Sequence, residues 1–106
     1  MCGRLTRIIP IEDIIQAFAI TENACDLGPS DNIAPTQPIA VIQEDSGVRR
    51  LVPVRWGLIP AWAKEPSIGN RMINARAETL SQQPSFRHAF KKRRCLIVAG
   101  GFFEFI

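Results

Sequence analysis

Residues 39–60 read IAVIQEDSGVRRLVPVRWGLIP, two apolar runs separated by a polar turn sequence. Runs rich in valine and isoleucine on either side of a glycine-containing turn are typical of a β-hairpin. We therefore predict two antiparallel strands that turn near Asp45–Gly47. Pro53 lies inside the second run. Because proline has no N–H to give to a neighbouring strand, this strand is expected at a sheet edge or at a bulge.

The segments around this hairpin complete an α+β pattern. In residues 8–20 apolar side chains recur every three or four positions, which predicts a short amphipathic helix. Residues 21–38 hold three prolines and many turn formers, so an ordered loop is expected there. We expect one or two helical turns in residues 84–92. Residues 94–106 predict a strand whose adjacent glycines permit a bulge or a close backbone approach.

The size and composition are those of one small globular domain. The chain has 106 residues, of which 46% are hydrophobic and 22% are charged, and this balance argues against disorder. It has neither the ~20 consecutive apolar residues of a membrane span nor a signal peptide, so a cytoplasmic location is expected. The chain stops at Ile106 inside an apolar strand. We expect either a second copy to cover that edge or a larger domain of which residues 1–106 are a piece.

The three cysteines, Cys2, Cys25 and Cys95, have different expected roles. They lack a CxxC spacing and have only His88 as an imidazole partner, which argues against a zinc site. Cys95 lies in the apolar run CLIVAGG and is expected in the core, whereas Cys25 lies in a polar loop and has no evident role. Cys2 directly follows the initiator methionine, which is normally removed in front of so small a residue.

A trimmed chain would carry an α-amine and a thiol on neighbouring carbons of Cys2. An α-amine titrates near about 7.7–8.0, so roughly a tenth of it is free base at neutral pH. This amine can attack an aldehyde to give a Schiff base, and the adjacent sulfur lies at the distance for five-membered ring closure. The position of Cys2 therefore predicts a reagent that traps a carbonyl group.

Basic residues are concentrated near one end of the chain. The net charge is only +3, but five of the thirteen lysines and arginines lie within positions 87–94. Such a cluster is either a solvated face or a surface for a polyanion.

Five strings in the chain together resemble one known family. They are MCGRLTR at 1–7, NIAPTQPIAV at 32–41, RWGLIPAWAK at 55–64, INARAET at 73–79 and RCLIVAGGFFEF at 94–105. In this order they resemble the SOS response-associated peptidase (SRAP) family, the abasic-site processing proteins. The resemblance covers the chain but only about the first half of a family domain. It implies a mostly antiparallel, strongly curved, barrel-like β-structure with flanking short helices, here incomplete.

The resemblance also implies an activity in the response to DNA damage. Family members bind single-stranded DNA, and their residue-2 cysteine forms a thiazolidine with the aldehyde of an abasic site, which crosslinks and shields the lesion. No cofactor, metal or membrane is implied, and the expected location is the nucleoid. Two alternatives stay open. One is a thiol (auto)peptidase with Cys2 as the nucleophile, and the other is a non-catalytic nucleic-acid-binding fragment that self-associates through its sheet edge.

The resemblance assigns roles to individual residues. The catalytic residues it implies are Cys2, Asn74, whose amide hydrogen-bonds near the cysteine, and Glu104, which handles protons. The DNA-binding residues it implies are Gly3, Arg4, Trp62, Arg76, Arg87 and Phe105. Taken alone, Asn74 also suits a turn and Glu104 an outward-facing strand position. Burial of a carboxyl group raises its pKa and suits it to acid–base work.

The chain departs from the family pattern at several points, which include Asp31, where an aromatic residue is common, and Phe103, which lacks a hydroxyl group. Phe105 stands where a tryptophan is expected to wedge against DNA. The active-site histidine of the family falls beyond residue 106, and His88 is not its equivalent. Trp56, by contrast with Trp62, is expected in the core.

Overall fold

The computed structural model describes residues 2–104, which form two small sheets, two short α-helices and one 3₁₀ helix. One sheet has the order β2 (Glu22–Asn23), β5 (Val48–Arg55), β4 (Pro38–Asp45), β6 (Leu96–Ile97). The other has the order β3 (Ser30–Ile33), β1 (Leu5–Arg7), β7 (Gly101–Phe102). The helices are α1 (Ile11–Ala17), the 3₁₀ helix η1 (Pro66–Asn70) and α2 (Arg87–Lys92).

The predicted hairpin is confirmed, because β4 and β5 pair antiparallel in one continuous register. Ser46 and Gly47 form its two-residue turn with φ angles of 52° and 82°. Positive φ at both turn positions matches the right-handed twist of the flanking strands. Pro53 lies opposite Ala40, past the two residues of β5 that pair with β2. Its missing N–H therefore falls on a stretch that β2 leaves uncovered.

The segments around the hairpin depart from the prediction in their detail. The helix expected over residues 8–20 is the shorter α1, and Ala19, with a φ of 51°, follows its end. The loop expected over residues 21–38 contains β2, which is parallel to β5, and β3, which is antiparallel to β1. Both strands are too short to show a periodic pattern, and partners distant in the sequence stabilise them.

The strand expected over residues 94–106 is divided between the two sheets. β6 pairs with β4, and β7 pairs with β1. Gly100 lies where the chain passes from one sheet to the other, and a Cβ there would lie 3.2 Å from Oγ1 of Thr6. The predicted close backbone approach at the double glycine is confirmed. Instead of a bulge within one strand, the chain has two separate strands on either side of residues 98–100.

Strand β4 separates two hydrophobic clusters. The first contains Ile14, Ile20, Cys25, Ala40, Ile42 and Leu51. The second contains Ile33, Ile39, Val41 and Trp56. Successive residues of β4 contribute to opposite clusters, as the alternation of side chains along a strand requires. The prediction that Trp56 lies in the core is confirmed, since only 6% of it is exposed.

The expectation for Cys95 is wrong, and Cys25 has a packing role that the sequence did not indicate. Cys25, for which the sequence indicated no role, is buried in the first cluster with α1. Cys95, expected in the core, is an exposed residue that precedes β6. A local apolar run does not specify burial, because burial depends on which distant segment covers the run.

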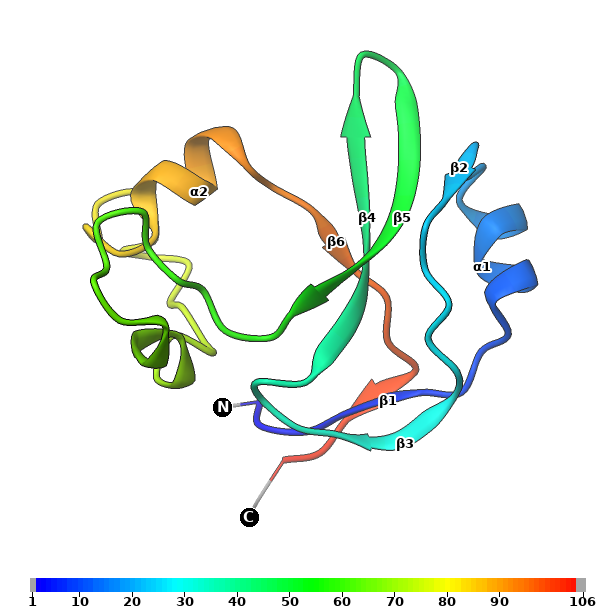
Figure 1. Cartoon of the computed structure of the whole chain (residues 1–106), viewed down its shortest axis with the longest axis horizontal. Helices are drawn as coiled ribbons and strands as arrows, with labels where there is room; N and C mark the ends of the chain where they lie inside the picture. Colours follow the sequence, from blue (N-terminus) through cyan, green and yellow to red (C-terminus); the bar gives the residue numbers. More distant parts are fainter. Residues whose placement is uncertain (1, 105–106) are drawn as a thin grey trace.

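Figure 1 shows the long β4–β5 hairpin between α1 and β2 on one side and α2 with its neighbouring loops on the other. The two sheets are mostly antiparallel, as expected, but within residues 2–104 they do not close into a barrel. Leu96 of β6 and Phe102 of β7 stay 60% and 64% exposed. None of the helices in the described part of the chain has the length and hydropathy of a membrane span.

Candidate active site

Cys2 lies against the second hydrophobic cluster. Its side chain is half-buried and packs on the cluster that contains Val41 and Trp56. Its Sγ atom lies 3.8 Å from the backbone carbonyl oxygen of Arg4. Strand β1 begins at Leu5 and pairs on both sides, with β3 and β7. The N-terminal segment is therefore anchored to a sheet only three residues after the cysteine.

Asn74 is held directly against Cys2. Its Nδ2 atom donates a hydrogen bond of 2.8 Å to the backbone carbonyl oxygen of Cys2. The preceding residue, Ile73, packs on the second cluster, and its carbonyl oxygen accepts a 3.2 Å hydrogen bond from Nε1 of Trp56. Trp56 thus positions Asn74 in addition to filling the core. Reasoning from sequence missed this second role, since it treated Trp56 as core alone.

Arg4 lies on the exposed rim of the same site. Its Nη1 atom donates a 3.3 Å hydrogen bond to Oδ1 of Asn32 on β3. Its backbone carbonyl oxygen accepts a 3.0 Å hydrogen bond from the N–H of Phe103. Asn32, which orients the guanidinium group, is a second residue that the sequence did not single out, although it lies within the quoted string NIAPTQPIAV.

Glu104 follows the stretch of chain that pairs with β1. Leu5 lies opposite Phe102 in the β1–β7 register, and the Phe103–Arg4 hydrogen bond carries the pairing one residue further. Glu104 is the next residue after Phe103, and continuation of this register would put it opposite Gly3. The side chain of Glu104 is exposed, so the burial considered for it is wrong.

The other predicted DNA-binding residues are distributed over loops and helix α2. Arg76 is exposed two residues after Asn74. Trp62 is 58% exposed in the loop between β5 and η1. Arg87 is exposed as the first residue of α2. Phe105 lies outside the described residues. The structure therefore brings Cys2, Arg4 and Asn74 together, and it places Trp62 and Arg87 on separate elements.

The loop that carries Trp62 is closed at its base by a tight contact. Arg55 donates a hydrogen bond from Nη2 to Oδ1 of Asn70. Gly57, with a φ of 131°, lies against the backbone of Gly69 so closely that a Cβ at residue 57 would clash with the carbonyl oxygen of Gly69. These contacts fix both ends of the loop and leave its tip exposed.

Ionisable groups outside this region offer little further chemistry. No group of three or more His, Cys, Asp or Glu side chains within residues 2–104 is placed to hold a metal ion. Neighbouring atoms partly desolvate the thiol of Cys95 and so raise its pKa, although the residue as a whole is exposed. A raised pKa lowers the fraction of reactive thiolate at neutral pH.

Comparison with known proteins gives the context of this site. Abasic site processing protein YoqW of Bacillus subtilis (strain 168) is 49% identical over 106 residues, covering 98% of this chain and 47% of that protein. Abasic site processing protein HMCES of Mus musculus is 32% identical over 127 residues, covering 98% of this chain and 36% of that protein. The chain spans about half the length of the curated relatives it matches.

The fold has a counterpart among solved structures. A crystal structure of a protein from Bordetella bronchiseptica matches with a TM-score of 0.76 at 25% identity, covering 97% of this chain and 50% of that chain. The family described as SOS response associated peptidase (SRAP) matches residues 1–105. This chain therefore belongs to the SRAP family.

Proposed function

We propose that this chain processes abasic sites in DNA by forming a covalent crosslink between Cys2 and the aldehyde of the ring-opened sugar. The main support is the position of Cys2, which is packed against the core and held by the hydrogen bond from Asn74. The names of the relatives, abasic site processing proteins, support the same substrate.

The chemistry needs only the two nucleophiles of one residue. After removal of Met1, the α-amine of Cys2 attacks the aldehyde carbon, and loss of one water molecule gives a Schiff base. The sulfur then adds to the same carbon while the thiol proton passes to the nitrogen, which closes a thiazolidine ring. Because the side chain of Cys2 is half-buried against a fixed cluster, the sulfur starts near the position it needs.

Two neighbours assist this reaction. Asn74 positions the main chain of Cys2 through its carbonyl oxygen. Glu104 follows the stretch paired with β1, and continuation of that register would put it opposite Gly3, within one residue of the amine. We assign to its carboxyl group the transfer of protons as water leaves the intermediate.

The DNA strand is held by exposed residues near the cysteine and on two further elements. Arg4 and Arg76 offer guanidinium groups to phosphates. Gly3 has no atom within 4 Å of the space where a Cβ would lie, which leaves room for a close approach of the strand. Trp62 offers an exposed ring for stacking on an unpaired base, which favours single-stranded DNA. Arg87 extends the basic surface along α2. A protein that processes abasic sites is expected to be located with the chromosomal DNA.

The exposed apolar edge is expected to be covered by a second copy of the chain. Leu96, Ile97 and Phe102 are 60%, 53% and 64% exposed on β6 and β7. An uncovered edge with such residues promotes association. Sedimentation of the full chain checks this, with a concentration-dependent dimer expected. A monomer throughout the concentration range would exclude the second copy.

A single experiment tests the proposed reaction. The protein is mixed with a single-stranded oligonucleotide carrying one abasic site, and the products are separated on a denaturing gel. We expect a shifted band that is lost in Cys2→Ala. The band should be kept in Cys95→Ser, because the thiol of Cys95 has no adjacent amine and takes no part in the reaction. An adduct that persists in Cys2→Ala would contradict the proposal. Cleavage of a peptide substrate without an adduct would favour the peptidase, and salt-sensitive binding without a covalent band would favour the binding fragment.

A further inference from the structure

Strand β4 loses its neighbour halfway along one edge. β6 pairs with Val41 and Ile42, and the Val98 N–H donates to the carbonyl oxygen of Ala40 at one end of this contact. At the other end β4 continues to Asp45. Within residues 2–104, no strand pairs with residues 43–45 on that side.

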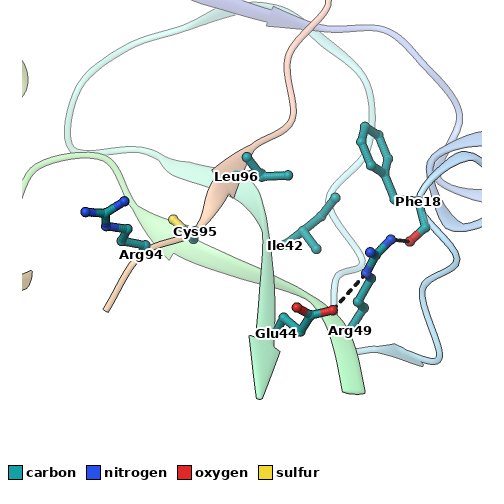
Figure 2. A pocket seen from close by; sticks show the side chains of 7 residues that line it. All are labelled: Phe18, Ile42, Glu44, Arg49, Arg94, Cys95 and Leu96. Carbon is teal, nitrogen blue, oxygen red and sulfur yellow. Dashed lines mark hydrogen bonds and ion pairs between the residues drawn. The ribbon is translucent and has the colours of Figure 1, made fainter. Parts of the chain in front are cut away.

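A slot opens at this point between β4 and the chain that follows α2. One cavity of about 650 Å³ is lined by Phe18, Ile42, Glu44, Arg49, Arg94, Cys95 and Leu96 (Figure 2). A second cavity of about 430 Å³ is also lined by Glu44, Arg94 and Cys95, together with Gln43 and Asp45. The first cavity includes Ile42 of β4 and the second includes Gln43 and Asp45, and since successive residues of a strand point to opposite faces, the slot reaches both faces of the sheet.

The walls of the slot have complementary charges. Ile42 lies opposite Leu96 in the existing register. Continued along both chains, this register places Glu44 opposite Arg94 and, one residue further, Asp45 opposite Arg93. Directly opposed residues in antiparallel strands lie on the same face, and opposite charges in such pairs stabilise the sheet. The sequence therefore provides an acid–base match at both positions beyond the end of β6.

Arg94 has a different partner in the open arrangement. Its guanidinium carbon lies 3.7 Å from the ring centre of Phe90, and its Nε donates a 2.6 Å hydrogen bond to the carbonyl oxygen of Phe90. Figure 2 shows the Arg94 side chain directed away from Glu44, which pairs instead with Arg49 at 3.0 Å. Arg94 therefore contacts Phe90 of α2, and Glu44 is a possible second partner on the other side of the slot.

We propose that residues 93–95 form a strap that closes onto β4, with Arg94 exchanging Phe90 for Glu44. Closure extends the pairing of β6 with β4 as far as the hairpin tip. Because residues 40 and 98 form a hydrogen-bonded pair, every second pair along the register does so too. The amides of Glu44 and Arg94 thus become mutual donors to each other's carbonyl oxygens. Closure also draws the end of α2 at Lys92 toward the hairpin. This inference does not depend on the proposed reaction.

Amide hydrogen exchange of the full chain, followed by NMR, tests the strap. We expect the amides of Glu44 and Arg94 to be protected at low salt and to exchange faster as salt screens the charges. Glu44→Gln should speed exchange at Arg94 by about two- to fivefold, the size that one exposed charge pair supports. Phe90→Leu removes the ring that competes with Glu44 for Arg94, and it should slow exchange at the Arg94 amide.

Matched controls separate the strap from general loosening. Glu12→Gln removes one exposed carboxylate from α1, a residue that lines neither cavity, and should leave the Arg94 amide unchanged. Asp45→Asn should act like Glu44→Gln, since it removes the second expected pair. Equal exchange rates of the Arg94 amide in Glu44→Gln and Glu12→Gln, or faster exchange in Phe90→Leu, would overturn the proposal.

Discussion

The amide of Asn74 donates a hydrogen bond of 2.8 Å to the backbone carbonyl oxygen of Cys2, across 72 positions of the sequence. The bond reaches the main chain of the cysteine and leaves the amine and the thiol to react. Asn74 is therefore a positioning residue for the proposed reaction.

Asn74→Ala should slow crosslinking without weakening DNA binding. Loss of one hydrogen bond of about 1–1.5 kcal/mol predicts a rate about five- to tenfold lower. Gel time courses give the rate, and fluorescence anisotropy with an intact single strand gives the affinity. Asn74→Asp, which has no side-chain donor, should show the same loss, whereas the exposed Gln83→Ala should not. An unchanged rate in Asn74→Ala would remove Asn74 from the site.

Arg76→Gln and Arg87→Gln should each reduce the salt dependence of DNA binding. Removing one arginine that binds a phosphate lowers the slope of log affinity against log salt by about 0.7 for single strands. Anisotropy titrations at several salt concentrations measure this slope on a Cys2→Ser background, in which no crosslink forms. Arg50→Gln is the matched control, because Arg50 is paired with Glu22 at 2.7 Å. A slope that does not differ from the control would mean that the arginine does not bind a phosphate.

Leu51→Ala should strongly destabilise the fold. Leu51 is fully buried in the first cluster, with 0% exposure, and such truncations cost about 2–5 kcal/mol. Urea denaturation followed by circular dichroism gives the free energy of unfolding. The half-buried Val48→Ala, near the hairpin tip, should cost clearly less. Equal losses would indicate that the packing around β5 differs from that described.

Gly57→Ala should be more destabilising than Gly47→Ala. Both glycines have positive φ, but residue 47 has open space beside it, whereas a Cβ at residue 57 meets the carbonyl oxygen of Gly69. We expect about 1 kcal/mol for Gly47→Ala from backbone strain alone and at least about 2 kcal/mol for Gly57→Ala. Thermal melts of the two variants compare them, and equal melting temperatures would argue against the tight contact.

Cys95 should be alkylated slowly at neutral pH and faster as the pH rises. Desolvation raises the pKa of its thiol, so at a given pH the folded protein holds less thiolate there than the unfolded chain does. Peptide mapping after maleimide treatment measures the rate at Cys95 over a pH series. In urea the rate should increase at the lower pH values, because the desolvating neighbours are gone. A faster reaction in the folded protein would show that the sign of the shift is wrong.

The hairpin could be predicted because its signals are local. The turn residues Ser46 and Gly47 and the valine-rich runs on either side lie within one short segment. Strand β3 could not be predicted in the same way, since it forms only through pairing with β1, with Ser30 opposite Arg7. Likewise Cys25 is buried because α1 supplies Ile14 to the same cluster, and nothing next to Cys25 in the sequence indicates that contact.

The candidate site was partly predictable for a similar reason. The chemical role of Cys2 follows from its position, and the resemblance to a family indicated Asn74. The supporting contacts could not be predicted from the sequence. Asn32 is hydrogen-bonded to Arg4 across 28 positions of the sequence, and Trp56 to Ile73 across 17. Polar side chains that orient other residues have no periodic pattern and are found only when the fold brings their partners together.

The alternation of β4 between two clusters has a consequence for how this protein tolerates change. Ile42 and Ala40 pack with the α1 side, whereas Val41 and Ile39 pack on the side that holds Cys2. Substitutions that accumulate around α1 over evolutionary time should therefore change the free energy of unfolding and leave the reaction of Cys2 unchanged. Among proteins with this fold, we expect the residues on the α1 face of β4 to vary more than those on the face that holds Cys2.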